Sequence, residues 1–216
     1  MTAQTLLSVV VDVRETVPRV RVSPHDLEAV CARAEEVLSA YEFARCTRMV
    51  QAPARMLRTA AHVLKRDALA AALGLPPRDV PLVEPSDRPA LAAPHAALRV
   101  SLSHTHGAVA IAFALTPVGV DIETLGRSND TAAIARRYFA PGEVDAMRDD
   151  PEGVRFARLW TAKEALKKAA DINLFEALAR PMPHDMRETF EAHGAQFDVM
   201  RPADGYVCAV ARMTAR

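Results

Sequence analysis

The sequence predicts an α+β protein made of two similar α/β halves related by a pseudo-twofold, each with a strand, then helices, then a strand hairpin. Two short similarities indicate the repeat: VVVDVR at 9–14 resembles VGVDIE at 118–123, and AVAIAFAL at 108–115 resembles YVCAVARM at 206–213. The 216 residues, 50% of them hydrophobic, suffice for two small cores. We therefore expect an N-terminal half over residues 1–116 and a C-terminal half over 117–216.

The N-terminal half begins with a segment rich in β-branched residues, which favours a buried strand. Ser23 followed by proline is typical of a helix N-cap with a proline in the first turn. A longer helical pattern ends at Gly74 and the prolines that follow it. The elements expected in this half are a strand at 5–13, a helix from 23, a helix at 53–73, and a hairpin with strands at 98–103 and 108–115 and a loop at 104–107.

The C-terminal half follows a short link at Thr116-Pro117 and opens with a compact apolar strand. Helical patterns come next, and a strand pair joined by a proline-containing turn closes the chain. The expected elements are a strand at 118–123, helices near 131–138, 141–147 and 152–170, and strands at 195–201 and 205–212.

Composition excludes several classes of protein. The 27 basic residues balance the 27 acidic ones, whereas a nucleic-acid binder usually has a basic excess. The three cysteines lack CxxC spacing, so neither a disulfide framework nor a zinc site is expected. Neither a signal peptide nor an apolar run of about 18 residues is apparent, which predicts a cytoplasmic protein without membrane association.

Two acids on one predicted strand are the first candidate site. Asp121 and Glu123 are two residues apart, so their carboxylates lie on the same face while Ile122 points into the core. A hard divalent cation such as Mg²⁺ prefers oxygen ligands and would offset their repulsion. A solvated strand end explains an isolated pair of this kind equally well.

The segment WTAKEALKK at 160–168 is the second candidate site. Helical spacing puts Lys163, Glu164 and Lys168 on one broad side, although Glu164 and Lys168 also fit an ordinary surface ion pair. Ser103-His104 at a predicted hairpin tip suits anion binding or a plain polar loop. A GxSxG nucleophile elbow is absent, which argues against a serine hydrolase.

Taken together, these motifs resemble the signature of the 4′-phosphopantetheinyl transferases. VGVDIE at 118–123, FAPGE at 139–143 and WTAKEALKK follow the family order, with 43 residues from Asp121 to Glu164. SLSHTHG at 101–107 is similar to the family's SHS-type loop, and SDRPAL at 86–91 takes the place of its GKP-type loop. The matches indicate the larger, two-half class, in which one chain supplies both sides of the cleft and a monomer is expected.

The resemblance implies a reaction. Coenzyme A would bind in a cleft between the halves, with its nucleotide end on the N-terminal half and Mg²⁺, or Mn²⁺, on the C-terminal half. A serine of an apo acyl- or peptidyl-carrier protein would attack the β-phosphorus. The carrier would gain 4′-phosphopantetheine, and adenosine 3′,5′-bisphosphate would leave.

The resemblance also implies residue roles. Asp121, Glu123 and Glu164 would hold the metal, and Glu164, or a metal-bound water beside it, would accept the serine proton. Lys163 would assist catalysis, and Glu143 would support the site. The helix arginine of the family falls near Arg55 and Arg58, either of which could reach coenzyme A. The expected contacts to coenzyme A are Arg45, Arg88, Pro89, Ser103, His104, Asp121, Lys163 and Lys168.

Two rival functions stay open at this point. A non-catalytic module that binds coenzyme A or a carrier protein would show the same fold, although the retained acids argue against it. An unrelated Mg²⁺-dependent phosphoryl-transfer enzyme is disfavoured because the GxxxxGK[ST] motif is absent. Two interpretations of four further arginines stay open: they could form a basic rim that binds the carrier protein, or each could simply lie on a solvated helix face. These are Arg136, Arg137, Arg155 and Arg158.

Overall fold

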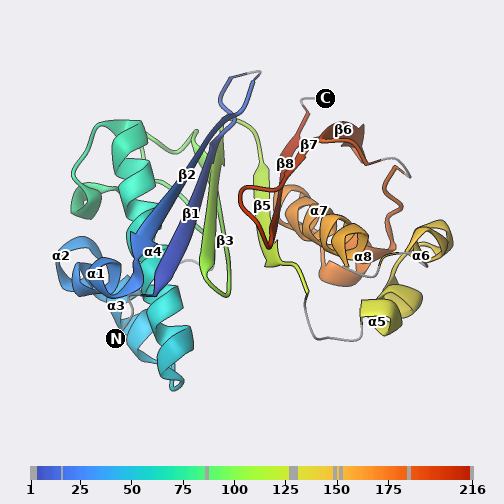
Figure 1. Cartoon of the computed structure of the whole chain (residues 1–216). Helices are drawn as coiled ribbons and strands as arrows, with labels where there is room; N and C mark the ends of the chain where they lie inside the picture. Colours follow the sequence, from blue (N-terminus) through green and yellow to red (C-terminus); the bar gives the residue numbers. More distant parts are fainter. Residues whose placement is uncertain are drawn as a thin grey trace. The chain divides into compact units, whose positions relative to one another are not determined.

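The structure is a computed structural model of the chain, and it describes residues 4–15, 17–85, 88–126, 131–147, 150, 153–183 and 186–214. It contains two four-stranded sheets with helices, which confirms the predicted α+β class (Figure 1). The chain forms two compact units, residues 1–115 (unit 1) and 116–216 (unit 2). Within the described residues, no helix combines the length and apolar character needed to cross a membrane.

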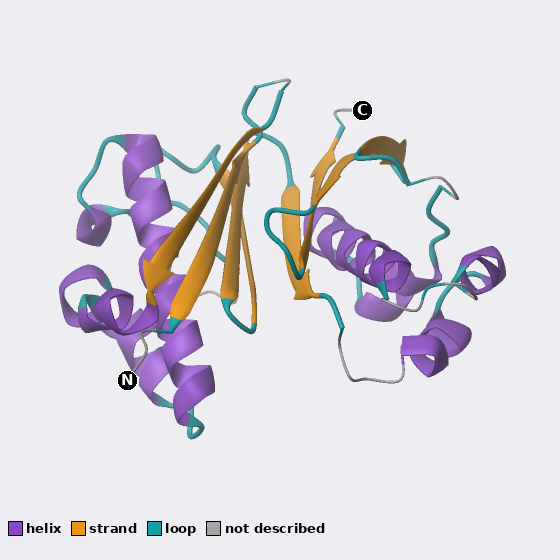
Figure 2. Cartoon of the chain, viewed as in Figure 1, coloured by secondary structure: helices purple, strands orange, loops and turns teal. Residues whose placement is uncertain are grey.

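Unit 1 is a mixed sheet with helices packed on one face (Figure 2). Strand β1 lies between β2 and β4; it runs antiparallel to β2 and parallel to β4, and β4 forms an antiparallel hairpin with β3. The strands are β1 (Thr5–Asp12), β2 (Arg19–Asp26), β3 (Arg99–Thr105) and β4 (Ala108–Ala114). The helices are α1 (Leu27–Ala32), α2 (Ala34–Val37), α3 (Ala40–Thr47), α4 (Ala52–Leu73) and the 3-10 turn η1 (Pro77–Asp79).

The helix expected from Ser23 is wrong. Residues 19–26 form β2, an edge strand that pairs with β1 and places Pro24 opposite Leu7. Proline is tolerated there because an edge strand need not donate all of its N–H groups to the sheet. The helix begins four residues later, where the Asp26 carboxylate accepts a hydrogen bond from the Ala29 N–H at 2.9 Å.

Unit 2 is an all-antiparallel sheet in the order β5-β8-β7-β6. Helix α7 packs across β5 and β8, and the core lies between this helix and the sheet. The strands are β5 (Val118–Thr124), β6 (Thr189–Ala192), β7 (Ala195–Met200) and β8 (Tyr206–Met213). The helices are α5 (Thr131–Tyr138), α6 (Pro141–Ala146), α7 (Val154–Ala170) and α8 (Leu174–Ala179).

The predicted elements of unit 2 are present, with two additions. Strand β6 and helix α8 were not predicted, and Glu152, the expected start of α7, lies outside the described residues. The expected internal repeat is approximate, because β1 and β4 are parallel whereas β5 and β8 are antiparallel.

Gly119 is the point at which α7 meets β5. A Cβ at this position would lie 2.0 Å from the Ala165 carbonyl oxygen and 2.7 Å from the Ala169 nitrogen. Only glycine therefore allows the helix backbone to approach so closely. This close packing brings the last turns of α7 beside the acidic end of β5.

Candidate active site

A pocket of about 340 Å³ in unit 1 contains all five coenzyme A contacts predicted for the N-terminal half. Helices α3 and α4, strand β3 and the loop between η1 and β3 form its wall. The lining residues are Tyr41, Glu42, Arg45, Arg58, His62, Lys65, Leu82, Val83, Glu84, Arg88, Pro89, Leu102, Ser103 and His104.

Local structure positions these side chains. A capping box between Ser39 and Glu42 fixes the start of α3, and Arg45 in its last turn lies with its guanidinium carbon 5.6 Å from the centre of the Tyr41 ring. Ser103 lies on β3, within the strand expected at 98–103, and His104 also belongs to β3 rather than to the hairpin loop expected at 104–107. Ser86 and Asp87, in the segment that resembles the GKP-type loop, lie outside the described residues.

The structure separates the two candidate helix arginines. Arg58 lines the pocket, and its Nε is buried without a hydrogen-bond partner among the described residues. Arg55 instead donates from Nη1 to the Met49 carbonyl at 2.9 Å and does not line the pocket. A buried donor without an acceptor is costly, so Arg58 is the arginine suited to an anionic ligand.

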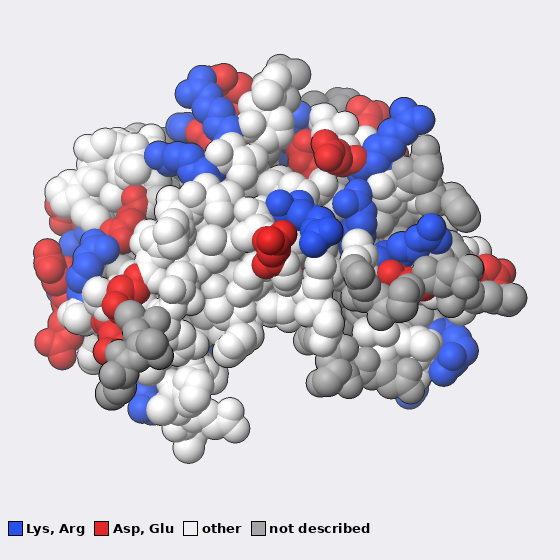
Figure 3. Space-filling view, viewed as in Figure 1, with Lys and Arg blue, Asp and Glu red and all other residues white. Residues whose placement is uncertain are grey.

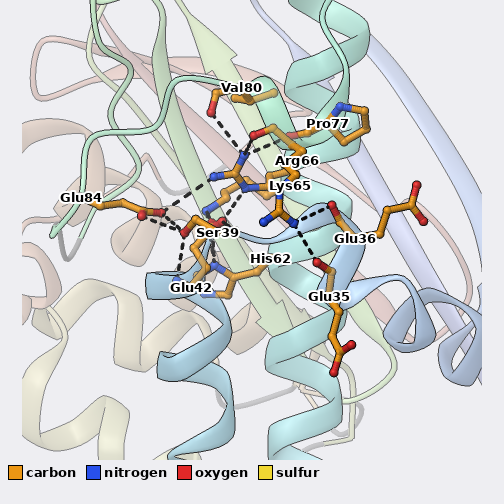
Figure 4. Close-up of polar contacts among 11 residues, drawn as sticks. Glu35, Glu36, Ser39, Glu42, His62, Lys65, Arg66, Pro77, Val80 and Glu84 are labelled. Atoms are coloured by element: carbon orange, nitrogen blue, oxygen red, sulfur yellow. Dashed lines mark hydrogen bonds and ion pairs between the residues drawn. The ribbon is translucent and has the colours of Figure 1, made fainter.

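A buried ionic cluster at the pocket was not predicted (Figure 4). Glu42, only 3% exposed, accepts a hydrogen bond from Lys65 Nζ at 2.5 Å and another from Arg66 Nε, and its Oε1 lies 3.2 Å from Nδ1 of His62. Burial raises the pKa of Glu42, but the hydrogen bonds from its three partners and the charge of Lys65 outweigh it and hold this pKa far below its usual range. Glu42 is therefore a carboxylate that holds the cluster together.

Helical spacing was the available signal for this cluster. His62, Lys65 and Arg66 are three and four residues apart on α4, so they share one face. Their acidic partner, Glu42, comes from α3, about 20 residues earlier, and sequence spacing alone does not reveal such a pairing.

In unit 2, the geometry around Asp121 follows from its place on β5. Asp121 is 5% exposed, and its Oδ1 accepts a hydrogen bond from Lys168 Nζ at 2.9 Å. Lys168 also donates to the Val120 carbonyl at 2.8 Å. The structure thus brings together two of the predicted site residues, one from β5 and one from α7.

Glu123 and Glu164 are the other two predicted metal ligands. Glu123 is half-buried and lies two residues beyond Asp121 on β5. Glu164 is half-buried on α7 and lies 3.2 Å from Lys167 Nζ. Among the described residues, no group of three or more His, Cys, Asp or Glu side chains is arranged to hold a metal ion, so the expected three-carboxylate cluster is not formed in this structure.

Lys163 has a different place from the one predicted. Its side chain is fully buried, and its Nζ donates to the Leu178 carbonyl at 2.8 Å and lies 3.0 Å from Glu143 Oε2. Burial lowers the pKa of Lys163, and the Glu143 charge opposes this shift only in part. The expected phosphate contact is therefore replaced by a structural one, since a fully buried ammonium cannot reach a ligand.

Glu143 completes this buried pair. Its carboxylate accepts hydrogen bonds from the Ala140 N–H at 3.0 Å and the Met182 N–H at 2.8 Å. It joins the start of α6, the segment after α8 and Lys163 on α7, and so supports the helix that carries Glu164.

Three of the four arginines considered for a carrier surface lie in two different environments. Arg137 lies over the Tyr138 ring, whose neighbour Phe175 is 63% exposed. Arg155 and Arg158 line a pocket of about 570 Å³, and Arg158 donates to the Met186 carbonyl at 2.9 Å. On the face shown in Figure 3, basic and acidic side chains lie in small mixed groups.

Comparison with known proteins places these motifs in a family. A model of the 4′-phosphopantetheinyl transferase superfamily matches residues 117–211. The 4′-phosphopantetheinyl transferase HetI of Nostoc sp. is 33% identical over 139 residues, which are 61% of this chain and 59% of that protein. The chain thus matches less than two thirds of the length of this relative. The segment 117–211, which contains β5 and α7, is thus similar to the 4′-phosphopantetheinyl transferase superfamily, in line with the resemblance of its motifs.

Proposed function

We propose that the protein transfers the 4′-phosphopantetheine group of coenzyme A to a serine of an apo acyl- or peptidyl-carrier protein, with Mg²⁺, and releases adenosine 3′,5′-bisphosphate. In this reaction the serine oxygen forms a bond to the β-phosphorus, and the bond from that phosphorus to the bridging oxygen breaks. The serine proton must pass to a base, and the leaving bisphosphate keeps the bridging oxygen.

The observation that carries the proposal is the cationic lining of the pocket in unit 1. Three arginines, Arg45, Arg58 and Arg88, share this pocket with the Ser103 hydroxyl and the His104 ring. Arginine binds phosphate oxygens in pairs through its planar fork, and a hydroxyl and an imidazole add further donors. The chemistry suits the phosphorylated nucleotide end of coenzyme A, with Pro89 as an apolar wall.

The donor set in unit 2 suits a hard cation. Asp121, Glu123 and Glu164 offer carboxylate oxygens, and Mg²⁺ commonly takes one or two carboxylates while water and substrate phosphates complete its octahedron. A preformed cluster of three protein ligands is therefore unnecessary. When bound, Mg²⁺ would supply positive charge against the charge that develops on the leaving phosphate.

The chain's own residues have separate tasks in this proposal. Lys168, now on Asp121, would donate to a phosphate oxygen once that carboxylate turns to the cation. Glu164 is assigned the serine proton, because it is half-buried on the same helix and its carboxylate can accept a hydrogen bond. Lys163 and Glu143 hold the helix in place and contact neither substrate.

A carrier-modification assay tests the proposal. The purified protein is incubated with coenzyme A, Mg²⁺ and a panel of apo acyl- and peptidyl-carrier proteins, and the carriers are weighed by mass spectrometry. We expect at least one carrier to gain one phosphopantetheine group, and Glu164→Gln to slow the gain by about 100-fold or more, the range of a lost general base. The matched control Glu176→Gln alters an exposed acid of α8 and should leave the rate unchanged.

Two results would contradict the proposal. If no carrier gains mass although coenzyme A binds in a calorimetric titration, the protein is a binding module. If Glu164→Gln and the wild type modify carriers at the same rate, the proton goes to another group.

A further inference from the structure

We propose that His62 is a proton-coupled ligand of the pocket in unit 1: it takes up a proton as a phosphate monoester dianion enters, and its two ring nitrogens then donate to Glu42 and to a phosphate oxygen. This inference rests on the proposed function in one respect, since the nucleotide end of coenzyme A carries such a monoester. His62 belongs to the cluster that sequence motifs did not reveal.

The contacts of His62 assign its proton in the ligand-free protein. Its Nδ1 lies 3.2 Å from Glu42 Oε1 and 3.3 Å from Lys65 Nζ. Glu42 is ionised, so a bare Nδ1 would place one lone pair against another. Lys65 has three rotatable hydrogens and already reaches the same carboxylate oxygen at 2.5 Å, so it does not need the ring nitrogen. The neutral ring therefore carries its proton on Nδ1 and leaves Nε2 bare.

The ring is held in this neutral form by its surroundings. His62 is only 15% exposed on its side chain, and burial lowers its pKa. Glu42 opposes this shift, but the charges of Lys65 and Arg58 add to it. At neutral pH the ligand-free pocket therefore has a neutral imidazole with an acceptor nitrogen on the edge opposite Glu42.

A dianionic phosphate in the pocket reverses this balance. A phosphate monoester has a second pKa of about 6, so it is largely dianionic at pH 7. Its oxygens repel a bare Nε2, whereas a protonated Nε2 makes a charge-assisted hydrogen bond. An opposite charge within 4–6 Å favours the charged form of a titratable group, so the bound dianion raises the pKa of His62 and favours its protonated ring.

Other charged groups face the same pocket and must be separated in the test. The arginines stay charged throughout the pH range, so they do not take up protons. His104 is the second imidazole in the lining and needs its own variant. Among the described residues, the charged and titratable groups facing His62 or the pocket are Tyr41, Glu42 and Arg45 on α3, Arg58, Lys65 and Arg66 on α4, Glu84 and Arg88 on the following loop, and His104 on β3.

Calorimetry measures how many protons the protein takes up when a nucleotide binds. Coenzyme A and adenosine 3′,5′-bisphosphate are titrated into the protein at pH 7, without metal and with chelator, in three buffers of different ionisation enthalpy. The wild type should take up between about half a proton and one proton, and His62→Gln less than about 0.2. His95→Gln, outside the pocket, should match the wild type, and dephospho-coenzyme A, which lacks the monoester, should bind with little uptake.

A measurement on the wild type alone guards against misfolding of a variant. The Hε1 resonance of His62 is followed by NMR from pH 5 to 9 with and without adenosine 3′,5′-bisphosphate. We expect the midpoint to rise by at least about one unit on binding, and affinity to weaken as pH rises through the midpoint of the complex.

The outcomes separate this inference from the proposed function. The inference is overturned if a nucleotide binds and the His62 midpoint does not shift. It is also overturned if proton uptake persists in His62→Gln and disappears in His104→Gln. Either result leaves the proposed function intact. If none of the three nucleotides binds, either without metal or after Mg²⁺ is added, both are wrong.

Discussion

At the scale of single residues, two buried acids are paired with buried lysines, Glu42 with Lys65 and Glu143 with Lys163. The motifs assign Glu143 a supporting role and do not include Glu42, yet each of these acids is the buried partner of a buried lysine. Removing one member of such a pair leaves an uncompensated charge in the interior, which is more costly than losing an exposed ion pair.

Replacing Glu42 by glutamine should strongly destabilise the protein. Lys65 and Arg66 would lose their carboxylate while staying buried, so we expect a loss of about 3–5 kcal/mol in the free energy of unfolding, measured by urea denaturation at pH 7. Glu36→Gln, an exposed acid on α2, should change it by less than about 0.5 kcal/mol.

The contribution of Glu42 to the free energy of unfolding should depend on pH. The pKa of Glu42 is lower in the folded protein than its ordinary value of 4.5, so its stabilisation is complete above that value and is lost as pH falls toward the folded pKa. The difference between wild type and Glu42→Gln should therefore be constant from pH 7 to about 5 and shrink below about 4. A difference that grows on acidification would contradict the assignment.

Lys163→Met should mainly lower the stability of the protein, whereas Lys168→Met should mainly lower its activity. Lys163→Met leaves Glu143 buried without its cation and should cost about 3–5 kcal/mol in unfolding free energy, with the KM for coenzyme A little changed. Lys168→Met also removes the cation beside Asp121, but Lys168 is 24% exposed on its side chain, so the loss of stability should be smaller than for Lys163→Met, while KM rises or kcat falls. Steady-state kinetics below the unfolding transition separate the two effects. A large KM change in Lys163→Met alone would restore the predicted phosphate contact.

At the scale of elements, the contact between α7 and β5 positions the candidate metal ligands of unit 2. Asp121 and Glu123 lie on the strand, and Glu164 and Lys168 lie on the helix. Their proximity depends on a strand residue without a side chain, because the Ala165 carbonyl occupies the place of a Cβ at Gly119.

Gly119→Ala should therefore push α7 away from β5. We expect a loss of about 3 kcal/mol or more in the free energy of unfolding and a fall in transfer rate, since overpacking against backbone is not relieved by a rotamer change. Gly142→Ala is the control, because a Cβ there meets nothing within 4 Å and alanine is favoured in a helix. Equal stabilities of the two variants would show that α7 does not need this close approach.

At the scale of the whole molecule, the chain has two cores, one in each unit. The residues that match the superfamily model are 117–211, whereas the cationic pocket is built from α3, α4, β3 and a loop in unit 1. In the proposed reaction, unit 1 would supply cations for the nucleotide and unit 2 would supply carboxylates for the metal.

The sequence by itself determined the α+β class, the principal strands and helices, and the resemblance to the 4′-phosphopantetheinyl transferases. These follow from local patterns: β-branched runs, helical periodicity, and motifs whose residues are close along the chain. It misassigned residues 19–26, because an edge strand with a proline resembles the start of a helix.

Only the tertiary structure decided which charged side chains are buried and with what partners. Lys163 was predicted to bind phosphate and instead lies with Glu143, while Arg58 rather than Arg55 lines the pocket. Glu42 on α3 and His62 on α4 form a contact that the motifs did not predict, because the two helices pack side by side. The physical reason is that the energy of a charge depends on its surroundings in three dimensions, which residue spacing along a chain does not specify.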